Sequence, residues 1–445
     1  MMHKRILITL LFVAVASIML AQQYKQLTDV PTVYIETEGN QTVSSKEEYI
    51  KCCFVMVDGD SIARYDSTLI RGRGNSSWWN SEKKPYRIKF NKKQRLLGEG
   101  FAHAKNWTLL ANHGDKTMIR NALTYQLGRF LGMDFCPAAK FVDLYMNGQY
   151  RGTYQISDQV QVHKKRVEVD ENDGWLLEVA NENSKEDPYI TSTRYGIMYN
   201  IKNPKDEKLT LEKRIAIGQW IRKFEEDVEE YVDKDDLVNW YVGAELTGNI
   251  DALYSIYMYK EAGEQKMHFG PLWDLDLGYD NSSERSLLRD MEAYLGLWNR
   301  PFEKIVQRLW ETPWFATACN NRLNELVNKG LQTYLIESID SLRNAIWESQ
   351  TENFKVWPIN KKVYDWEKHS YYNTYDGYIS ELKSFVNIHI PYLQDTFAKK
   401  LPAGIHDSSV ESQNTGATYD LQGRRIDKVN RKGVYIQNHH KIIIQ

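Results

Sequence analysis

The sequence predicts an α+β protein with two lobes, one rich in strands and a second built mostly of helices. Before Leu209, aromatic and β-branched residues alternate with polar ones in several short runs, as they do in half-buried strands. After Leu209, apolar residues recur three or four positions apart over a charged opposite face, which is the pattern of amphipathic helices. Strands first and helices later favour the α+β class, and a cleft between two lobes is a usual place for a ligand.

Strand signals fill most of the first half of the chain. Residues 22–45 are polar except for one alternating run at 32–38, which predicts an edge strand. The pair Asn147-Gly148 stands between two alternating aromatic runs and predicts a β-hairpin with a tight turn. Further strands are predicted at 52–59, 65–74, 85–90 and 174–181.

Helical signals begin inside the strand-rich half. Residues 115–131 predict a helix, with Asp115 as its N-cap and apolar residues from Ile119 to Phe130 at helical spacing. Apolar residues within 217–231 are spaced alternately four and three apart, which predicts a second helix. Further helical segments are predicted at 235–248, 301–346 and 375–399.

The first residues predict a secretory signal peptide. A basic start is followed by an apolar run from Ile6 to Leu20 and by the small residue Ala21, so residues 1–21 are assigned to this peptide. The run is short for a membrane span, and an uncleaved anchor stays open as the alternative. No second stretch reaches membrane length, so the mature chain is expected to be secreted, periplasmic or at the cell surface, without a membrane span.

Composition divides the rest of the chain into four parts. Residues 22–45 form an N-terminal strand and linker, and residues 46–401 form the main domain. Residues 402–418 are polar and rich in Ser, Gly and Asn, which predicts a linker. Residues 419–445 hold three short strand-like runs, too few for a core of their own. They form a β tail that either docks elsewhere or serves as a sorting tag.

Charge and cysteine content exclude two classes of function. The formal net charge is -2, so no global field favours a nucleic-acid partner. The four cysteines include the adjacent pair Cys52 and Cys53, and their spacing fits no metal site. An oxidising compartment permits one disulfide, but the sequence does not say which cysteines would pair.

Residues 268–281, with the sequence HFGPLWDLDLGYDN, carry the strongest chemical signal. Asp274 and Asp276 would point to the same face of a strand, and paired carboxylates suit a hard cation such as Mg²⁺. A hairpin predicted over 251–276 would bring Asp251 towards Asp274. Kinases use such an arrangement, in which the loop acid orients the attacking hydroxyl and the second acid holds magnesium. The alternative is that all three acids cap turns at the surface.

A second candidate site lies in the stretch LIRGRGNSSWW. Arg71 and Arg73 alternate with glycines and are followed by Asn75, so guanidinium groups and exposed backbone amides could cradle phosphate oxygens. Lys89 follows on a predicted strand, where a kinase keeps its phosphate-contacting lysine. The alternative is a charged hairpin turn.

Four motifs resemble the CotH (spore coat protein H) kinase family, and they occur in the same order as in that family. They read RGRGNSSWW…KKPYRIKF, NWTLLANHGDKTMIRNAL, LYMNGQYRGTYQISDQV and GPLWDLDLGY. The resemblance covers roughly residues 45–400. It implies a secreted, atypical protein-kinase-like fold that binds ATP and Mg²⁺ and transfers the γ-phosphoryl group to Ser or Thr of a protein. The tail resembles the short C-terminal extensions of secreted proteins from Bacteroidetes-like bacteria.

The resemblance also assigns roles to individual residues. It implies that Asp251 is the catalytic-loop acid, that Asp274 binds the metal, and that Asp276 supports the metal or its water shell. The residues expected to contact the nucleotide are Arg71, Arg73, Asn75, Lys89 and Asp158.

The chain departs from the family pattern at two places. Ser255 and Ile256 stand where family members often carry a metal-binding Asn, and Asp158 stands where the family's hairpin usually leads to a Glu. ATP is also scarce outside the cytoplasm. The alternative function is therefore a catalytically inactive, kinase-like surface module that binds a protein or glycan partner. Trp78 and Trp79 would either stack on sugar rings or fill the core.

Overall fold

The computed structural model describes residues 24–249, 251–282, 300–365 and 372–401, together with the tail strands at 418–419, 425–426, 433–437 and 440–444. The chain divides into one compact unit that runs to Leu401 and a second from Pro402 to Gln445. The signal peptide predicted at 1–21 and most of the linker predicted at 402–418 lie outside the described residues. Among the described residues, no helix has both the length and the apolar character needed to cross a membrane.

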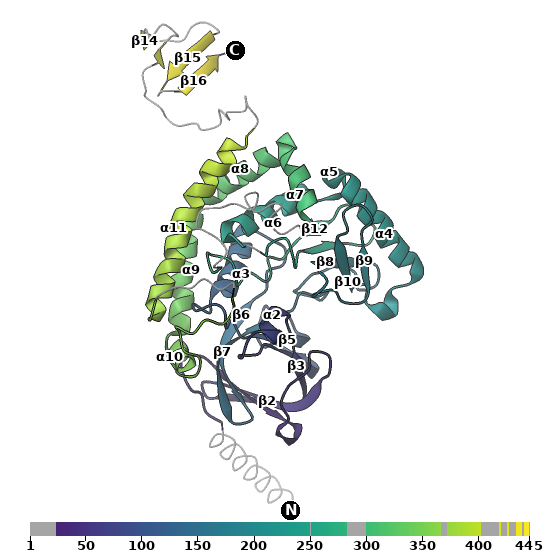
Figure 1. Ribbon diagram of the computed structural model, residues 1–445, viewed down its shortest axis with the longest axis vertical. Coiled ribbons are helices and arrows are strands. Elements are labelled where there is room, and N and C mark those ends of the chain that lie inside the picture. The colour runs from purple at the N-terminus through teal and green to yellow at the C-terminus, as the bar shows by residue number, and fades with distance from the viewer. Residues whose placement is uncertain are drawn as a thin grey trace, which may run out of the picture. The chain divides into compact units, whose positions relative to one another are not determined.

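Seven strands of the first unit close into a barrel (Figure 1). Around the barrel they are β1 (Thr32–Thr37), β2 (Ile50–Asp58), β3 (Ser61–Gly72), β4 (Tyr86–Gln94), β5 (Ala104–Leu110), β7 (Gln149–Ser157) and β6 (Ala139–Met146). The neighbours pair antiparallel, except that β1 pairs with β6 in parallel and so closes the ring. The predicted Asn147-Gly148 hairpin joins β6 to β7, and both of its turn residues have positive φ.

The alternation of side chains along β4 separates the barrel core from an outer polar face. Tyr86, Ile88 and Phe90 are buried in the core of the barrel. Arg87 and Lys89 point the other way, because successive side chains of a strand lie on opposite faces. The outer face of the barrel therefore carries the basic residues of this strand.

A second sheet has five strands, in the order β12-β11-β8-β10-β9. They are β8 (Trp175–Ala180), β9 (Tyr189–Thr191), β10 (Met198–Asn203), β11 (Tyr257–Lys260) and β12 (His268–Phe269). The β8 and β11 strands are far apart in sequence but pair antiparallel, with Glu178 opposite Tyr257. The predicted hairpin before the paired acids is present as β11 and β12, which also pair antiparallel.

Helices and this second sheet share one large core. The helices are α2 (Ser76–Trp79), α3 (Arg120–Leu131), α4 (Leu211–Glu226), α5 (Val228–Tyr231), α6 (Lys234–Thr247), α7 (Glu303–Trp310), α8 (Pro313–Asn328), α9 (Leu331–Ala345), α10 (Trp347–Val356) and α11 (Tyr375–Lys399). Two short 3-10 helices are η1 (Glu38–Asn40) and η2 (Asp206–Lys208). The α+β class is confirmed, whereas the two-lobed arrangement stays a prediction.

Two sequence-based expectations about local structure were wrong. The helix expected from Asp115 begins at Arg120, because the Asp115 carboxylate accepts the backbone N–H groups of Thr117 and Arg120 and holds a turn before the helix. The strand expected to carry Asp274 and Asp276 ends at Phe269. The acids lie on the loop that follows.

The second unit is described only by its strands. These are β13 (Thr418–Tyr419), β14 (Arg425–Ile426), β15 (Gly433–Gln437) and β16 (His440–Ile444), which form a four-stranded sheet in the order β14-β13-β15-β16. The β tail expected from the sequence therefore forms an antiparallel sheet.

Candidate active site

The loop after β12 takes Asp274 and Asp276 into a pocket. Asp274 has a φ of 61°, a left-handed conformation that the short polar side chain of Asp tolerates better than most. The loop is held from two sides, because the Asn249 amide donates to the Asp274 carbonyl (3.4 Å) and Leu275 N–H donates to Asn121 Oδ1 (3.3 Å). The two carboxylates therefore share one pocket without lying on a strand.

The two acids lie where a negative charge is unfavourable. The Asp274 side chain is exposed at the pocket, yet desolvation raises its pKa, against the attraction of Arg73. Desolvation raises the pKa of Asp276 to about 7, and repulsion from Asp274 adds to that shift. A bound cation would offset both effects. The donors are hard carboxylate oxygens, which suit a divalent cation such as Mg²⁺.

The structure brings Asp251 to the same place. Its backbone N–H donates to Asn249 Oδ1 (3.1 Å), so Asn249 connects the Asp251 turn to the Asp274 loop. The negative charge of Asp251 is close enough to raise the pKa of both Asp274 and Asp276. The side chain of Asp251 is 45% exposed, and one oxygen, Oδ1, pairs with Arg300 Nη2 (2.9 Å). All three acids named from the sequence are therefore neighbours.

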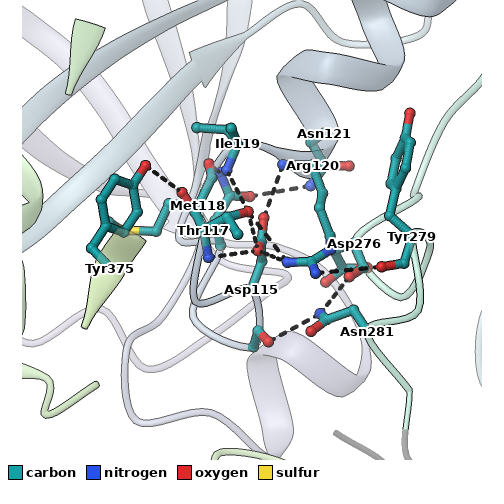
Figure 2. A network of polar contacts seen from close by, with 12 residues as sticks. Asp115, Thr117, Met118, Ile119, Arg120, Asn121, Asp276, Tyr279, Asn281 and Tyr375 are labelled. Atoms are coloured by element: carbon teal, nitrogen blue, oxygen red, sulfur yellow. Dashed lines mark hydrogen bonds and ion pairs between the residues drawn. The ribbon is translucent and has the colours of Figure 1, made fainter. Parts of the chain in front are cut away.

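A buried ion pair lies next to the acidic loop and helps to hold its backbone (Figure 2). The carboxylate of Asp115 pairs with the guanidinium of Arg120, and both side chains are almost fully buried. Arg120 also donates to the Tyr279 carbonyl (3.4 Å), while Asn281 donates to the Asp276 carbonyl (2.7 Å) and the Gly114 carbonyl (3.1 Å). The segment before α3 thus fixes the backbone around Asp276.

Sequence reasoning used this segment as part of a resemblance and took Asp115 only as the N-cap of a helix, with no role at the site. The available signal was Asp115 and Arg120 at the start of an apolar helix, since isolated opposite charges there are seldom buried unless they pair.

Arg73 lines the same pocket as the two acids. It is the opposite charge that most lowers the pKa of Asp274, and its guanidinium lies over the Trp273 ring at 6.0 Å. The loop needs its glycines for two reasons: a Cβ at Gly72 would meet the Trp78 ring at 2.5 Å, and Gly74 has a φ of 81°. These two glycines therefore fix the backbone on either side of Arg73.

Two more arginines stand behind Arg73 on the outer face of the barrel. Arg71 and Arg87 are cross-strand partners in β3 and β4. Their Nε atoms are buried and have no hydrogen-bond partner among the described residues. Desolvation lowers the pKa of Arg87, and the nearby arginines add to that shift, with Glu186 among the opposing charges. Guanidinium groups gathered in this way suit an anion with several oxygens.

The predicted lysine is not in the pocket, but another one is. Lys89 is exposed, with its Nζ over the Tyr49 ring at 5.8 Å. Lys83 lines the pocket and is fully buried, and desolvation lowers its pKa to about 7. Its Nζ donates to the Thr153 carbonyl (2.5 Å) and to Asn353 Oδ1 (2.9 Å). Spacing alone gave no sign that the residue before Lys84 would turn inward.

Asn75 and Asp158 are also placed away from the pocket lining. Asn75 Oδ1 accepts a hydrogen bond from Lys46 Nζ (2.9 Å). Asp158 forms a buried ion pair with Arg166 (2.8 Å) and accepts the Ala138 N–H (3.1 Å). Both carboxylate oxygens are thus occupied by protein groups, which is a structural role.

The pocket has room for an ion and part of a larger anion. Its cavity measures about 40 Å³, which accepts a few waters or an ion. Its polar lining residues are Arg73, Lys83, Asn112, His113, Asn121, Asp274 and Asp276. In such a pocket the carboxylates can hold a metal ion, and the cationic side chains can contact a phosphate chain that continues towards solvent.

Three comparisons relate the chain to known proteins. A search of curated proteins found no match. Among solved structures, a Golgi casein kinase is 11% identical, with 86% of this chain and 74% of that chain covered and a TM-score of 0.26. The same kinase with Mn/ADP bound is 10% identical, with 84% and 74% covered and a TM-score of 0.24. These two likenesses are too weak to support an argument.

The family comparison is specific. The model of the CotH kinase protein family matches residues 70–389, more than two thirds of the chain. The matched region begins inside β3 and contains the arginine loop, Lys83 and all three acids of the pocket. The chain therefore belongs to the CotH kinase protein family.

Proposed function

We propose that the protein is an extracytoplasmic, Mg²⁺-dependent protein kinase that transfers the γ-phosphoryl group of ATP to Ser or Thr of a surface or secreted protein. One observation carries the proposal. Asp274 and Asp276 repel each other in a pocket that Arg73 also lines, and Asn249 ties Asp251 to the same loop. Candidate ligands for a metal, a cation for an anion and a half-exposed carboxylate paired with Arg300 thus lie close together.

The acids of the pocket would bind the metal ion, and its cations would bind the phosphates. Asp274 would hold Mg²⁺ and Asp276 would support it, and the bound ion would neutralise charge on the phosphates. Arg73 and Lys83 line the wall that would face the phosphate oxygens. Arg87 lies behind them as a further cation. Their positions in the folded protein hold the phosphate chain without rearrangement at the moment of reaction.

Asp251 would orient the acceptor. Its side chain is 45% exposed, so a hydroxyl from another protein can reach it. A carboxylate oxygen within hydrogen-bond distance would align this hydroxyl with the γ-phosphorus and accept its proton as the new O–P bond forms, while the bond from the γ-phosphorus to the β–γ bridging oxygen breaks and ADP leaves. The extracytoplasmic location is proposed from the signal peptide expected at residues 1–21.

A thermal-shift assay tests nucleotide binding. A ligand that binds only the folded state raises the melting temperature by mass action, so ATP and Mg²⁺ together should raise it more than either alone. The Asp274→Asn variant is the matched control and should lose the joint effect. No joint shift at millimolar ATP would refute the nucleotide site. Transfer of label from γ-³²P-ATP to the protein itself then tests the reaction.

A catalytically inactive surface module is the second candidate function. Two observations favour it: Ser255, not Asn, contacts Asp274 Oδ2 (3.4 Å), and Trp79 is 69% exposed beside Lys46. Trp78, in contrast, is buried under the arginine loop and serves the core. Binding of the protein to a glycan array, lost in Trp79→Ala and accompanied by no phosphate transfer, would favour this module over the kinase.

A further inference from the structure

Arg300 is joined to the proposed catalytic acid across a long stretch of sequence. Its Nη2 lies 2.9 Å from Asp251 Oδ1, and the Arg300 side chain is only 7% exposed. The guanidinium stacks on the ring of Tyr254, with 4.7 Å between the guanidinium carbon and the ring centroid. Tyr254 belongs to the same turn as Asp251, since its N–H donates to the Asp251 carbonyl (2.9 Å). Arg300 thus contacts both ends of this turn, Asp251 and Tyr254.

The main chain of Arg300 is itself anchored. Its carbonyl accepts the N–H of Glu303, which starts α7. Phe302 and Ile305 beside it are buried in the large core. The arginine therefore reaches Asp251 from a fixed base, and its position does not depend on the bound substrate.

Asp251 needs such a partner because it is half-exposed on a turn. The turn fixes the backbone of Asp251, but an exposed Asp side chain keeps its rotamer freedom unless a partner holds it. Phosphoryl transfer depends on alignment of the attacking hydroxyl, and a misplacement of about 1 Å can lower the rate about a hundredfold. A carboxylate has two oxygens, and Arg300 occupies Oδ1, so Oδ2 is left for the acceptor.

We infer that Arg300 is a positioning residue: its guanidinium holds the Asp251 carboxylate in the orientation that receives the acceptor hydroxyl. This inference rests on the proposed function. Arg300 also helps three carboxylates share one site, since it supplies a positive charge to one of them. Sequence spacing could not show it, because Arg300 follows Asp251 by 49 positions.

The test measures the rate of autophosphorylation from γ-³²P-ATP and Mg²⁺ as a function of ATP concentration. Arg300→Gln should lower the maximal rate about tenfold to a hundredfold, because the hydroxyl loses its alignment. The ATP concentration for half-maximal rate should stay within about twofold, because the nucleotide contacts are intact. Arg300→Lys should recover part of the rate, and millimolar methylguanidinium should partly restore Arg300→Ala.

Two controls separate positioning from a general structural role. Arg308→Gln removes an arginine of α7, the helix that follows Arg300, one that donates to the carbonyls of Glu225 and Glu226, and it should leave the rate unchanged. The double variant Arg300→Gln/Asp251→Asn should be no slower than Asp251→Asn alone, since the two residues act as one unit. Additive losses would overturn the inference.

The other outcomes are also decisive. If Arg300→Gln keeps the wild-type rate or exceeds it, the inference is wrong while the proposed function stands. If the wild-type protein transfers no phosphate at all, the proposed function fails, and the positioning role fails with it because no acceptor is there to be aligned.

Discussion

At the residue scale, Asp276 shows how a proton and a metal compete for one place. Its pKa of about 7 in the folded protein, against an ordinary value of 3.8, means that the folded state holds a proton that the unfolded state has lost. Between about pH 4 and pH 7 the folded state binds more protons, so the stability of the metal-free protein falls as the pH rises. Above pH 7 this contribution is fully lost, and the carboxylate is free for a cation.

The first prediction follows from this competition. Below pH 7, Mg²⁺ must displace a proton from Asp276, so the Mg²⁺ affinity should rise by up to about tenfold per pH unit and level off above pH 7. Titration calorimetry at pH 6 and pH 8 measures the effect. In Asp276→Asn the affinity should be lower and almost independent of pH. An equal slope in this variant would mean that another group carries the proton.

The second prediction compares the three acids. Asp274→Asn should lower phosphoryl transfer by orders of magnitude, because an amide oxygen is a weaker ligand for a hard cation. Asp251→Asn should lower turnover but leave Mg-ATP affinity nearly unchanged, and Asp276→Asn should have an intermediate effect. Because Asp274 and Asp276 repel each other, the metal-free Asp274→Asn variant should melt at or above the wild-type temperature. Small, equal effects on activity in all three variants would restore the acidic-turn interpretation.

The third prediction separates two lysines of the same strand region. Lys83→Met should lower the Mg-ATP affinity at least about tenfold, the value expected when one charge-assisted hydrogen bond to a phosphate is lost. Lys89→Met is the matched control, because Lys89 is exposed outside the pocket, and stability there should change by less than about 0.5 kcal/mol. Isothermal titration with ATP and Mg²⁺ checks both variants. If Lys89→Met lowered the Mg-ATP affinity more than Lys83→Met, Lys89 would be the lysine that contacts the nucleotide.

Residue-scale prediction from sequence is possible where the chemistry is local. Asp274 and Asp276 stand out because two carboxylates one residue apart in an apolar stretch repel each other, and the structure places both in one pocket. Lys83 was missed because its direction depends on a packed loop and on Asn353, which lies 270 residues away. Arg300 was missed for the same reason.

At the element scale, the hairpin of β11 and β12 carries the acidic loop and is pinned to a helix. His268 on β12 pairs through Nδ1 with Asp236 on α6 (2.6 Å), and its ring stacks on Tyr259 of β11. Asp233 and Glu264 are the other charged groups facing the ring. The hydrogen bond to Asp236 raises the pKa of His268 to about 8. Asp233 is also the N-cap of α6, where its carboxylate accepts the backbone N–H of Asp236 (3.0 Å).

The fourth prediction concerns this pin. Because the pKa of His268 is raised above its ordinary value of 6.5, the stability that the pair contributes is fully present below about pH 6.5 and is lost as the pH rises through about 8. The melting temperature of the wild-type protein should therefore fall between pH 6 and pH 9 by more than that of His268→Gln. Parallel curves for the two proteins would show that the pair contributes no stability.

Elements were predictable where their pattern is regular and failed where tertiary contacts decide. The Asn147-Gly148 hairpin and the long C-terminal helices follow from turn chemistry and periodicity alone. The start of α3 was wrong by five residues, because the Asp115 carboxylate is occupied by the turn before the helix. Helix propensity does not show that the Asp115 carboxylate is already bonded to backbone N–H groups of this turn.

At the scale of the whole molecule, α10 couples the barrel to the helical part of the first unit. Asn353 of α10 accepts from both Lys83 and the Thr153 N–H, and Ser349 exchanges a hydrogen bond with the Thr153 hydroxyl. The N-terminus of α10 is capped from the first described segment, by Asp29. None of these contacts has a sequence signature, since each joins polar residues 70 or more positions apart.

The fifth prediction tests the division of the chain at Leu401. The described contacts that hold the pocket, including those of α10, all lie before this residue. A chain that ends at Leu401 should therefore keep its melting temperature within about 1 °C, a difference of about 1 kcal/mol or less, and should keep its response to ATP and Mg²⁺. A large fall in melting temperature would show that residues after Pro402 stabilise the first unit.

The parallel pairing of β1 with β6 has a consequence for the order in which the chain becomes folded. β1 can pair with β2 early, but its other neighbour, β6, is synthesised more than one hundred residues later. Until then β1 presents an unpaired edge that could recruit strands of another chain. A chain that is being synthesised, or exported with its N-terminus first, is thus prone to aggregate until Asp143 of β6 is available for pairing. Chaperones that cover the unpaired edge of β1 during this time would therefore raise the yield of native protein more than an increase in the stability of the folded state would.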